Sequence, residues 1–369
     1  MTSANRWTSD TEIEHSKDAT RRNSQTTIRH HYVPKMYLKR WSIAGSSEIQ
    51  YLNVKTNVGG CVDPDAIAFE ENFYEIEAPD IDSDLNPNMW FETHMGRIED
   101  KAAHWLRALD GLQDGRVRDP NILSNLAVYV GLQSQRTIRS RQSELDIGRA
   151  IEHYGAKYVL DIPDVLPSVC TLYNIPYSLV RHREIAQSVI NQGVISTSAQ
   201  PKAIESAIGV WRNRIVPHLE NDRSWWLAST KTPLITSDEP VVLIGTKRHS
   251  RELPVSFHSA PLILFPIGPR RLLVLAGQKA QLRGPTSLTP AETKFVNREL
   301  AFNCNELVFD EPGSTAAVQI RVPPYPSAAQ EFPASVRNFA ELARLVSLPT
   351  RWTGAPYQPQ WPLSRWTTP

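Results

Sequence analysis

Residues 261–276 read PLILFPIGPRRLLVLA and include the most apolar stretch of the chain. Two apolar runs, 262–267 and 272–276, are separated by Gly268-Pro269 and two arginines. Each run is too short to cross a membrane, which takes about 20 apolar residues. Short apolar runs bounded by Pro and Gly are typical of buried strands. We therefore expect two consecutive strands here, buried within a sheet.

Further short apolar runs lie on either side of this pair. They occupy residues 224–229, 234–236, 241–244 and 306–310. Pro, Gly and Asp separate these runs, a pattern that favours an antiparallel sheet. A helix is expected among them at 290–303.

The chain before residue 222 is mainly helical in pattern, because apolar side chains recur there at three- and four-residue steps. Helices are expected at 88–112, at 120–144 with helical signal continuing to about 160, at 181–192 and at 201–221. Strands are expected earlier, at 48–56 and 73–76. Because helices precede strands instead of alternating with them, we predict an α+β fold. Its helical N-terminal half would pack on a mainly antiparallel sheet from the C-terminal half.

The composition is that of a folded globular chain, with 369 residues of which 41% are hydrophobic and 21% charged. We expect residues 1–28, rich in Ser, Thr, Asn and charge, to be a disordered tail. Residues 29–321 would form a single α+β domain, helical over about 88–221 and sheet-rich over about 222–310. Residues 322–369 would be a Pro-rich extension with one helical piece near 335–345.

Charge and cysteine content narrow the function classes. The chain has 40 Lys and Arg against 39 Asp and Glu, so binding to a polyanion would need a local basic patch. Cys61, Cys170 and Cys304 lie far apart, which predicts neither disulfides nor structural zinc. Without a signal-peptide pattern or a membrane span, a cytoplasmic protein with no membrane partner is expected. The sequence contains no P-loop or GxGxxG pattern, so we expect no nucleotide cofactor.

Four segments carry a family resemblance. They are His30-His31-Tyr-Val-Pro34 with Leu38 and Trp41; Glu92 and Glu99; Gln133 and Arg136; and Trp226 with Thr236-Ser237-Asp238-Glu239-Pro240-Val241. In their order and spacing the chain resembles the family known as domain of unknown function 4238, over roughly residues 29–310. The resemblance implies membership in that family. The family name carries no reaction, so any chemistry rests on the side chains themselves.

Two adjacent histidines, His30 and His31, open the first of these segments. In an extended segment they point to opposite sides, so at most one of them faces a given site. Imidazole titrates near neutral pH, which makes one of them a candidate general base or metal ligand. In the structural alternative, one histidine donates to a backbone carbonyl and the other covers apolar surface.

Two acidic residues, Glu92 and Glu99, are two turns apart on one face of the predicted 88–112 helix, about 10 Å from each other. Carboxylates on an inward face need cations, a metal or a shared proton. They are candidate catalytic or metal-binding groups. They are equally candidate ion-pair partners for Arg136 and Arg139 from the next helix.

Gln133 and Arg136 lie one turn apart on the predicted 120–144 helix and face the same way. A guanidinium beside an amide is suited to a phosphate or carboxylate, because guanidinium binds these groups through two parallel hydrogen bonds. The alternative is that Arg136 is only the partner of Glu92 or Glu99.

Asp238 follows an apolar strand and precedes Pro240, which predicts a sharp turn. Asp in such a turn commonly caps the backbone, although strand ends also present reactive groups. Beside His31 and Glu99, Asp238 would complete an oxygen-plus-imidazole site for Mg²⁺ or Mn²⁺. Such a site requires residues far apart in the sequence to meet in space.

A basic stretch over residues 247–298 contains nine Lys and Arg against two acids. Few aromatic residues accompany them, so the pattern suits contact with nucleic-acid phosphates more than base stacking. The same charges can also protect the edge of a sheet from self-association.

Two functional hypotheses follow. In the first, the chain is a metal-assisted, nuclease-like hydrolase of a phosphodiester, suited to phage defence or to a toxin. Its catalytic candidates are His30, His31, Glu92, Glu99, Gln133, Arg136 and Asp238. In the second, the chain is a non-catalytic binding module. There the same residues form a buried polar network between the helical and sheet halves, and the basic stretch docks nucleic acid or a protein partner.

Overall fold

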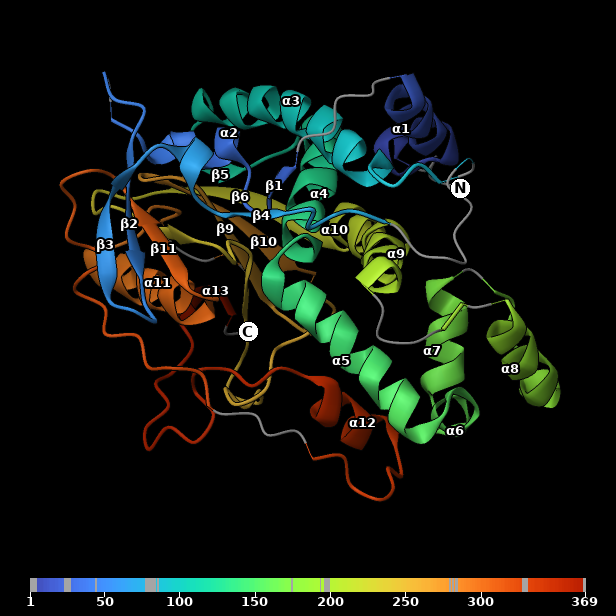
Figure 1. The fold of residues 1–369 in the computed structure, drawn as a ribbon. Helices are drawn as coiled ribbons and strands as arrows, with labels where there is room; N and C mark the ends of the chain where they lie inside the picture. The colour runs from blue at the N-terminus through green and yellow to red at the C-terminus, as the bar shows by residue number, and fades with distance from the viewer. Residues whose placement is uncertain are drawn as a thin grey trace.

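The computed structural model describes the chain except for residues 1–4, 23–27, 44, 77–83, 85, 174, 193, 196–199, 279, 281, 283–284, 327–330 and 368–369. Helices and antiparallel sheets make it an α+β protein, as the order of the predicted elements indicates (Figure 1). None of the helices in these described parts is long and apolar enough to cross a membrane.

The apolar stretch at 261–276 forms the middle of a five-stranded antiparallel sheet. In spatial order the strands are β5 (Gly115–Arg116), β6 (Arg223–Ser229), β10 (Arg271–Gly277), β9 (Leu262–Gly268) and β8 (Val242–Ile244). All seven residues of β9 are buried. This continuous burial explains why the strand has no polar alternation: both faces of the sheet are covered.

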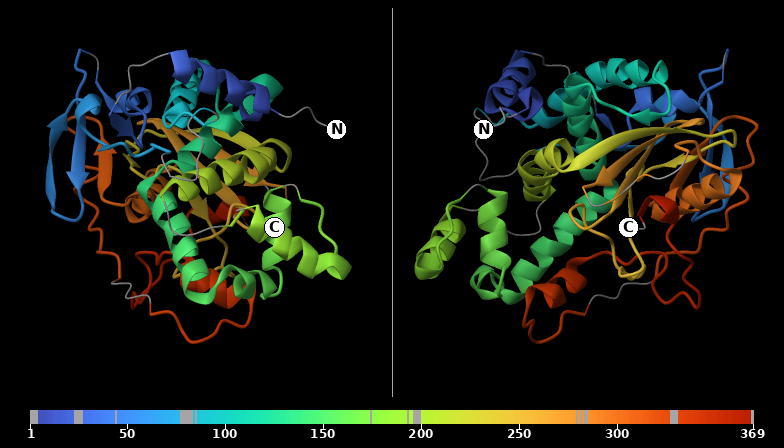
Figure 2. Two further views of the ribbon diagram at one scale, coloured as in Figure 1. Left: turned by 45° about the vertical axis from the view of Figure 1, so that its right-hand side comes forward. Right: turned by 180° about the vertical axis from the view of Figure 1, so that it is seen from behind.

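Several helices carry the motif residues or cover this sheet. They are α3 (Trp90–Asp110), α4 (Pro120–Gln135), α5 (Ile138–Tyr154), α9 (Gln200–Val210), the π-helical turn η5 (Trp211–Ile215), α10 (Val216–Asn221) and α11 (Pro290–Asn303). Shorter helices are α2 (Lys35–Leu38), α6 (Ala156–Asp161), α7 (Val165–Leu172) and α8 (His182–Asn191). In Figure 2, α6, α7 and α8 project away from the sheets.

Two apolar cores lie on opposite faces of the five-stranded sheet. On one face Ile263 and Phe265 of β9 belong to the core formed with α3, α4 and α10. On the other face Leu262 and Leu264 belong to the core formed with α11 and the C-terminal segment around Trp366. Neighbouring side chains of a strand point to opposite faces, so a single strand supplies both cores.

A four-stranded antiparallel sheet lies beside the first one. Its strands, in order, are β3 (Val58–Val62), β2 (Ile49–Asn53), β11 (Leu307–Asp310) and β7 (Thr236–Ser237), while β1 (Arg29–His31) pairs separately with β4 (Phe69–Glu71). The strands therefore come from both halves of the chain. The strand predicted at 73–76 is wrong, because residues 72–74 form a turn after β4.

The predicted helix over 120–144 is two helices, and the break falls within a motif. After α4 ends, Thr137 is the N-cap of α5, and its hydroxyl accepts a hydrogen bond from the Ser140 N–H at 3.2 Å. The Tyr74 hydroxyl donates to the carbonyl of Arg136, the residue between the helices. A contact from a distant segment thus stabilises a helix end where the apolar pattern itself continues.

We expected residues 1–28 to be a disordered tail, but part of this tail is folded. Residues 6–8 form η1 (Arg6–Thr8), and α1 (Asp10–Arg22) then packs on α3. Arg97 of α3 donates to the Glu12 carboxylate and, at 2.6 Å, to the Ser16 hydroxyl. Trp7 and Ile13 also join the main apolar core, but the other buried residues of α1, Glu12 and Ser16, are polar, so the segment lacks the apolar periodicity that would predict a helix. Residues 1–4 and 23–27 lie outside the described residues.

The C-terminal extension packs against the domain. It contains α12 (Phe339–Val346), close to the predicted helical piece, and α13 (Ser364–Thr367). α12 lies beside the far end of α5 (Figure 2). Just before α12, the carbonyl of Val336 accepts a hydrogen bond from the Tyr158 hydroxyl of α6 at 2.9 Å. Trp366 is fully buried in the core beneath the five-stranded sheet.

Candidate functional site

His30 is a buried structural residue on β1. Its Nδ1 accepts a hydrogen bond from the Tyr74 N–H at 2.9 Å, and the two rings stack with centroids 5.8 Å apart. These contacts attach the turn after β4 to β1. This role is close to the structural alternative, in which one of the two histidines bonds to the backbone. His30, however, accepts a hydrogen bond from a backbone N–H instead of donating one to a carbonyl.

His31 points to the other side of β1 and is also buried. Burial and the nearby cations Lys35 and Arg136 lower its pKa to about 4, although a hydrogen bond to the Asp65 backbone opposes the shift. The ring is therefore neutral at pH 7. Its Nε2 has no hydrogen-bond partner among the described residues.

Arg136 joins three motif segments. Its guanidinium donates to the Glu99 carboxylate on α3 and to the carbonyl of His31 on β1. Its own carbonyl accepts from the Tyr74 hydroxyl. The ion pair between Arg136 and Glu99 is the interhelical pairing that the sequence suggested as an alternative to phosphate binding. Because the guanidinium already has two protein acceptors, it forms part of the scaffold.

Glu92 lies two turns before Glu99 on α3 and has no such pairing. Burial raises its pKa to about 7, the Arg136 charge opposes this, and Glu99 adds to it. The Oε2 atom of Glu92 is buried and lacks a hydrogen-bond partner among the described residues. The carboxyl can therefore exchange a proton near neutral pH.

Asp238 organises the connection between α11 and β11. Its carboxylate accepts hydrogen bonds from the backbone N–H groups of Asn305 at 2.7 Å, Glu306 at 2.8 Å and Leu307 at 2.8 Å. Burial raises its pKa to about 6, against the effect of these three donors. These contacts agree with the expectation that Asp238 caps backbone N–H groups. The capped backbone lies at residues 305–307, far along the chain from the turn that contains Asp238.

The predicted metal ligands His31, Glu99 and Asp238 do not form a ligand cluster. Among the described residues, no three or more His, Cys, Asp or Glu side chains are grouped as a metal site would require. Glu99 pairs with Arg136, and Asp238 is bonded to backbone N–H groups. What the structure does bring together is His31, Glu99 and Arg136, with Glu92 close enough to Arg136 and Glu99 to respond to their charges.

Gln133 borders a pocket of about 400 Å³, named here the Gln133 pocket. The pocket is also lined by Thr137, Arg139, Glu239 and aromatic side chains that include Phe257, Phe302, Trp352 and Trp361. Gln133 has no exposed surface, and neither its amide nitrogen nor its amide oxygen has a hydrogen-bond partner among the described residues. Such groups are rare in native proteins, and an ordered water, an ion or a ligand can complete their bonding.

Glu239 is the second polar group of this pocket. Its Oε1 accepts from the Arg139 N–H at 3.1 Å, in the first turn of α5. Burial and the neighbouring Asp238 raise its pKa to about 8, although Arg139 and Thr137 oppose the shift. The carboxyl is therefore largely protonated at pH 7 and able to donate a hydrogen bond or a proton.

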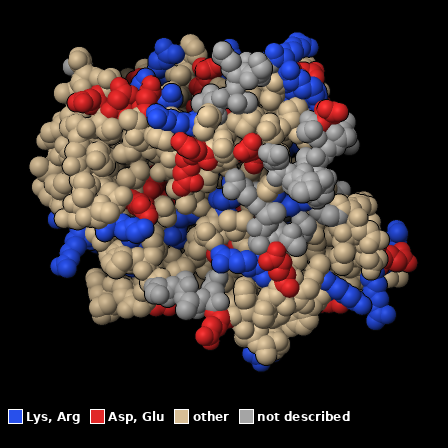
Figure 3. Space-filling view, viewed as in Figure 1, with Lys and Arg blue, Asp and Glu red and all other residues tan. Residues whose placement is uncertain are grey.

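The basic stretch is not a continuous patch. Most of its described cations have acidic partners: Arg251 and Arg298 with Glu299, Arg270 with Glu311 and Arg271 with Asp114. Lys279 and Arg283 lie outside the described residues. The face drawn in Figure 3 likewise mixes basic and acidic side chains. Lys247, Arg248 and Lys294 are exposed and have no ion pair among the described residues.

The motif segments also lie within a region that matches a known protein family. The family model described as protein of unknown function (DUF4238) matches residues 29–314. The chain belongs to this family. The DUF4238 match extends from β1 through β11 and contains every motif segment, while α1 and the C-terminal extension lie outside it. No curated protein and no solved structure gives a significant match to the chain.

Two residues of the DUF4238 site were not singled out from the sequence. Glu239 lies in the TSDEPV segment next to Asp238, and its position beside a helix N-terminus depends on the break between α4 and α5. Tyr74 bonds both to His30 and to Arg136, but the sequence placed it in a strand. The sequence feature that could have pointed to Glu239 is its place next to Asp238 in a predicted turn. No sequence feature pointed to a role for Tyr74.

Proposed function

We propose that the chain is a binding module whose motif residues form a buried polar scaffold around the Gln133 pocket. His30, Arg136 and Asp238 support this because their polar groups bond to other parts of the protein. Glu239 would contact the ligand, and ligand binding would have to expose the Gln133 amide, which is buried in the free protein. The observation that carries the proposal is the Gln133 amide, which is buried at the pocket without a hydrogen-bond partner among the described residues.

The ligand class follows from the groups that line this pocket. An amide offers a donor and an acceptor side by side, as does a protonated carboxyl such as that of Glu239. A glutamine amide pairs well with the edge of a nucleobase, and aromatic side chains pack on flat rings. We propose a flat, polar ligand such as a nucleobase. The location would be cytoplasmic.

Gln133→Leu tests the proposal without knowledge of the natural ligand. An unpaired buried amide costs about 1–3 kcal/mol, so replacing it with an apolar side chain of similar size should raise the free energy of unfolding. The matched control is Gln50→Leu on β2. The Gln50 amide is paired at both ends, donating to the Ser314 carbonyl at 2.8 Å and accepting from the Gly313 N–H at 3.2 Å.

The expected result is a higher melting temperature for Gln133→Leu and a lower one for Gln50→Leu. Adenosine, guanosine, cytidine and uridine should be added to the wild type and to Gln133→Leu in the same thermal assay. At least one nucleoside should stabilise the wild type and leave the variant unchanged. Equal destabilisation by the two Leu substitutions would contradict the proposal, because Gln133 would then have structural partners.

A second candidate function is metal-assisted hydrolysis of a phosphodiester, and the raised pKa of Glu239 favours it. A carboxyl with a pKa of about 8 in a pocket is suited to general acid catalysis near neutral pH. Mg²⁺ in such enzymes often takes only one or two protein carboxylates together with substrate phosphates. A role in phage defence or as a toxin would accompany this activity.

The hydrolase candidate is tested by cleavage of DNA and RNA with Mg²⁺ or Mn²⁺. Glu239→Gln is the informative variant, since it keeps the shape and removes the titrating group. Asp238→Ala is less suitable, because it removes three hydrogen bonds that hold the fold. Cleavage by the wild type that Glu239→Gln abolishes would support hydrolysis; cleavage unaffected by Glu239→Gln would exclude Glu239 as its acid.

A further inference from the structure

A larger pocket, of about 1070 Å³, lies at one end of the five-stranded sheet. It is bounded by the loop after β8, the segment leading into β9, the end of β10, the junction of α10 with β6, and residues 358–364 of the C-terminal extension. We name it the Lys247 pocket. It shares Arg251 and Trp361 with the Gln133 pocket, so the two are neighbours.

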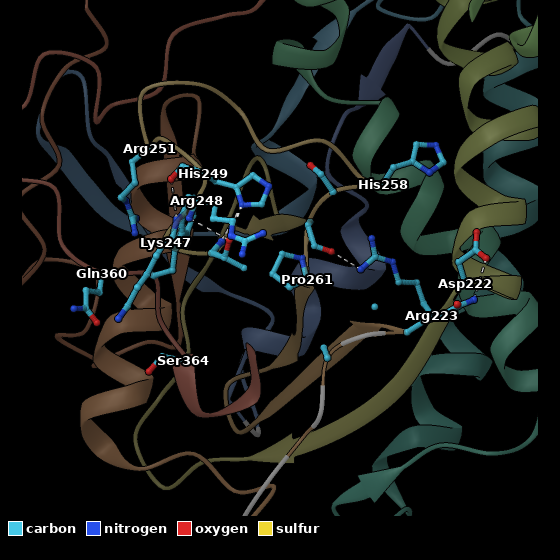
Figure 4. A pocket seen from close by; sticks show the side chains of 18 of the residues that line it. Asp222, Arg223, Lys247, Arg248, His249, Arg251, His258, Pro261, Gln360 and Ser364 are labelled. Atoms are coloured by element: carbon cyan, nitrogen blue, oxygen red, sulfur yellow. Dashed lines mark hydrogen bonds between the residues drawn. The ribbon is translucent and has the colours of Figure 1, made fainter. Parts of the chain in front are cut away.

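The Lys247 pocket carries an excess of basic groups. Figure 4 shows Lys247 and Arg248 on one side and Arg223 with His258 on the other. Asp222 is the acidic residue among the described residues that line it. Its carboxylate bonds to the His218 Nδ1 at 2.9 Å and accepts from the Gln278 amide at 3.4 Å. The pocket therefore favours an anion.

Arg223 holds the side of the pocket that presents His258. Its guanidinium is buried and donates to the His218 Nε2 at 3.0 Å, to the Ala260 carbonyl at 2.6 Å and to the Phe257 carbonyl. These bonds fix the backbone on both sides of His258. The His258 ring is exposed and lies 4.3 Å from the His218 ring, centroid to centroid.

The opposite side of the pocket is held by packing. A Cβ atom at Gly245 would lie 2.7 Å from the Trp361 ring and 2.9 Å from the His249 Cβ, so only glycine lets the loop after β8 pass this close to Trp361. The His249 Nδ1 accepts from the Thr246 N–H at 3.1 Å. Lys247 and Arg248 extend from this supported loop, exposed and without an ion pair among the described residues.

We propose that the Lys247 pocket binds a phosphate-bearing ligand, with Lys247 and Arg248 as its charged contacts and His258 as a contact from the opposite side. Guanidinium and ammonium groups form strong charge-assisted hydrogen bonds to phosphate. Arg223 is a positioning residue, because its donors are already bonded to protein acceptors. The phosphate can belong to a small molecule or to a nucleic-acid backbone. The site is separate from the ligand contacts proposed for Gln133.

The test uses the full chain and two probes in titration calorimetry: inorganic pyrophosphate, and a single-stranded DNA 12-mer. The informative variant is Lys247→Gln with Arg248→Gln. Its control is Lys157→Gln with Lys294→Gln, which removes two exposed lysines from helices that do not line this pocket. All four side chains are exposed, so the variants should fold.

The expected result is that the Lys247/Arg248 variant weakens binding of a probe at least about tenfold, the value of one charge-assisted hydrogen bond. The control variant should change it by less than about twofold. Loss of pyrophosphate binding would identify a small phosphate ligand, and loss of 12-mer binding alone would identify a nucleic-acid backbone. Absence of binding by both probes, or equal weakening by both double variants, would overturn the proposal.

Discussion

Asp238→Ala tests whether one buried carboxylate holds the connection between α11 and β11. The carboxylate accepts three backbone N–H groups at 2.7–2.8 Å. A hydrogen bond to a charged group contributes about 1.5–3 kcal/mol, and three bonds to one carboxylate are not fully additive. Ala leaves three backbone donors unpaired but also removes a buried charge, whose desolvation cost is reflected in the raised pKa, so we expect a net loss of about 2–4 kcal/mol in the free energy of unfolding at pH 7.5. At this pH, above its pKa of about 6, the carboxyl is ionised.

Urea unfolding at pH 7.5, followed by circular dichroism, measures this loss. Asp119→Ala is the matched control, because the Asp119 carboxylate accepts from the Asn121 N–H at 2.9 Å and the Ile122 N–H at 3.2 Å at the exposed start of α4. Removing such a cap costs about 1 kcal/mol. Asp238→Asn keeps one acceptor oxygen and should give an intermediate loss. If Asp238→Ala destabilised the protein no more than Asp119→Ala, the reasoning would be refuted.

Three further predictions concern other buried side chains. The pKa of Glu92 in the folded protein, about 7, lies above its ordinary 4.5, so the stability it contributes is complete below pH 4.5 and is lost as the pH rises through 7. Relative to wild type, Glu92→Gln should therefore gain up to about 3 kcal/mol between pH 5 and pH 8 in urea unfolding, and a pH-independent difference would contradict this. Arg136→Met leaves Glu99 without its partner and should cost about 3–5 kcal/mol in thermal unfolding, an effect that a prior Glu99→Gln substitution should reduce. Trp366→Ala should cost about 3–5 kcal/mol in the same assay, since Trp366 is fully buried, and a negligible effect would show that the extension is dispensable for stability.

Local sequence patterns were sufficient to predict a helix or strand where that element has a regular buried face. The run at 262–267 predicts β9 because every side chain is buried between two cores. The helix expected at 290–303 is α11, and its start is fixed locally by a capping box between Thr289 and Glu292. These signals are contained within a few residues, so no distant contact was needed to interpret them.

The site could be predicted only in part. The sequence supplied the motif residues and the possibility that Arg136 pairs with a glutamate of α3. It also suggested a metal cluster of His31, Glu99 and Asp238, which the described residues do not form, because convergence of distant residues depends on the packing of β1, α3 and β7. It also gave no means to see that Asp238 would bond to the backbone at 305–307.

By itself, the sequence determined the α+β order of elements, the buried central strands and the segments of the family. Periodicity and capping are local properties, because they depend only on residues that are close together in the sequence. Only the tertiary structure decided that the helix over 120–144 breaks at Arg136, where Tyr74 bonds to its carbonyl. Likewise only packing leaves the Gln133 amide buried without a described partner and raises the pKa of Glu239. Burial and pairing are set by residues far away in the chain, and for that reason the local pattern did not contain them.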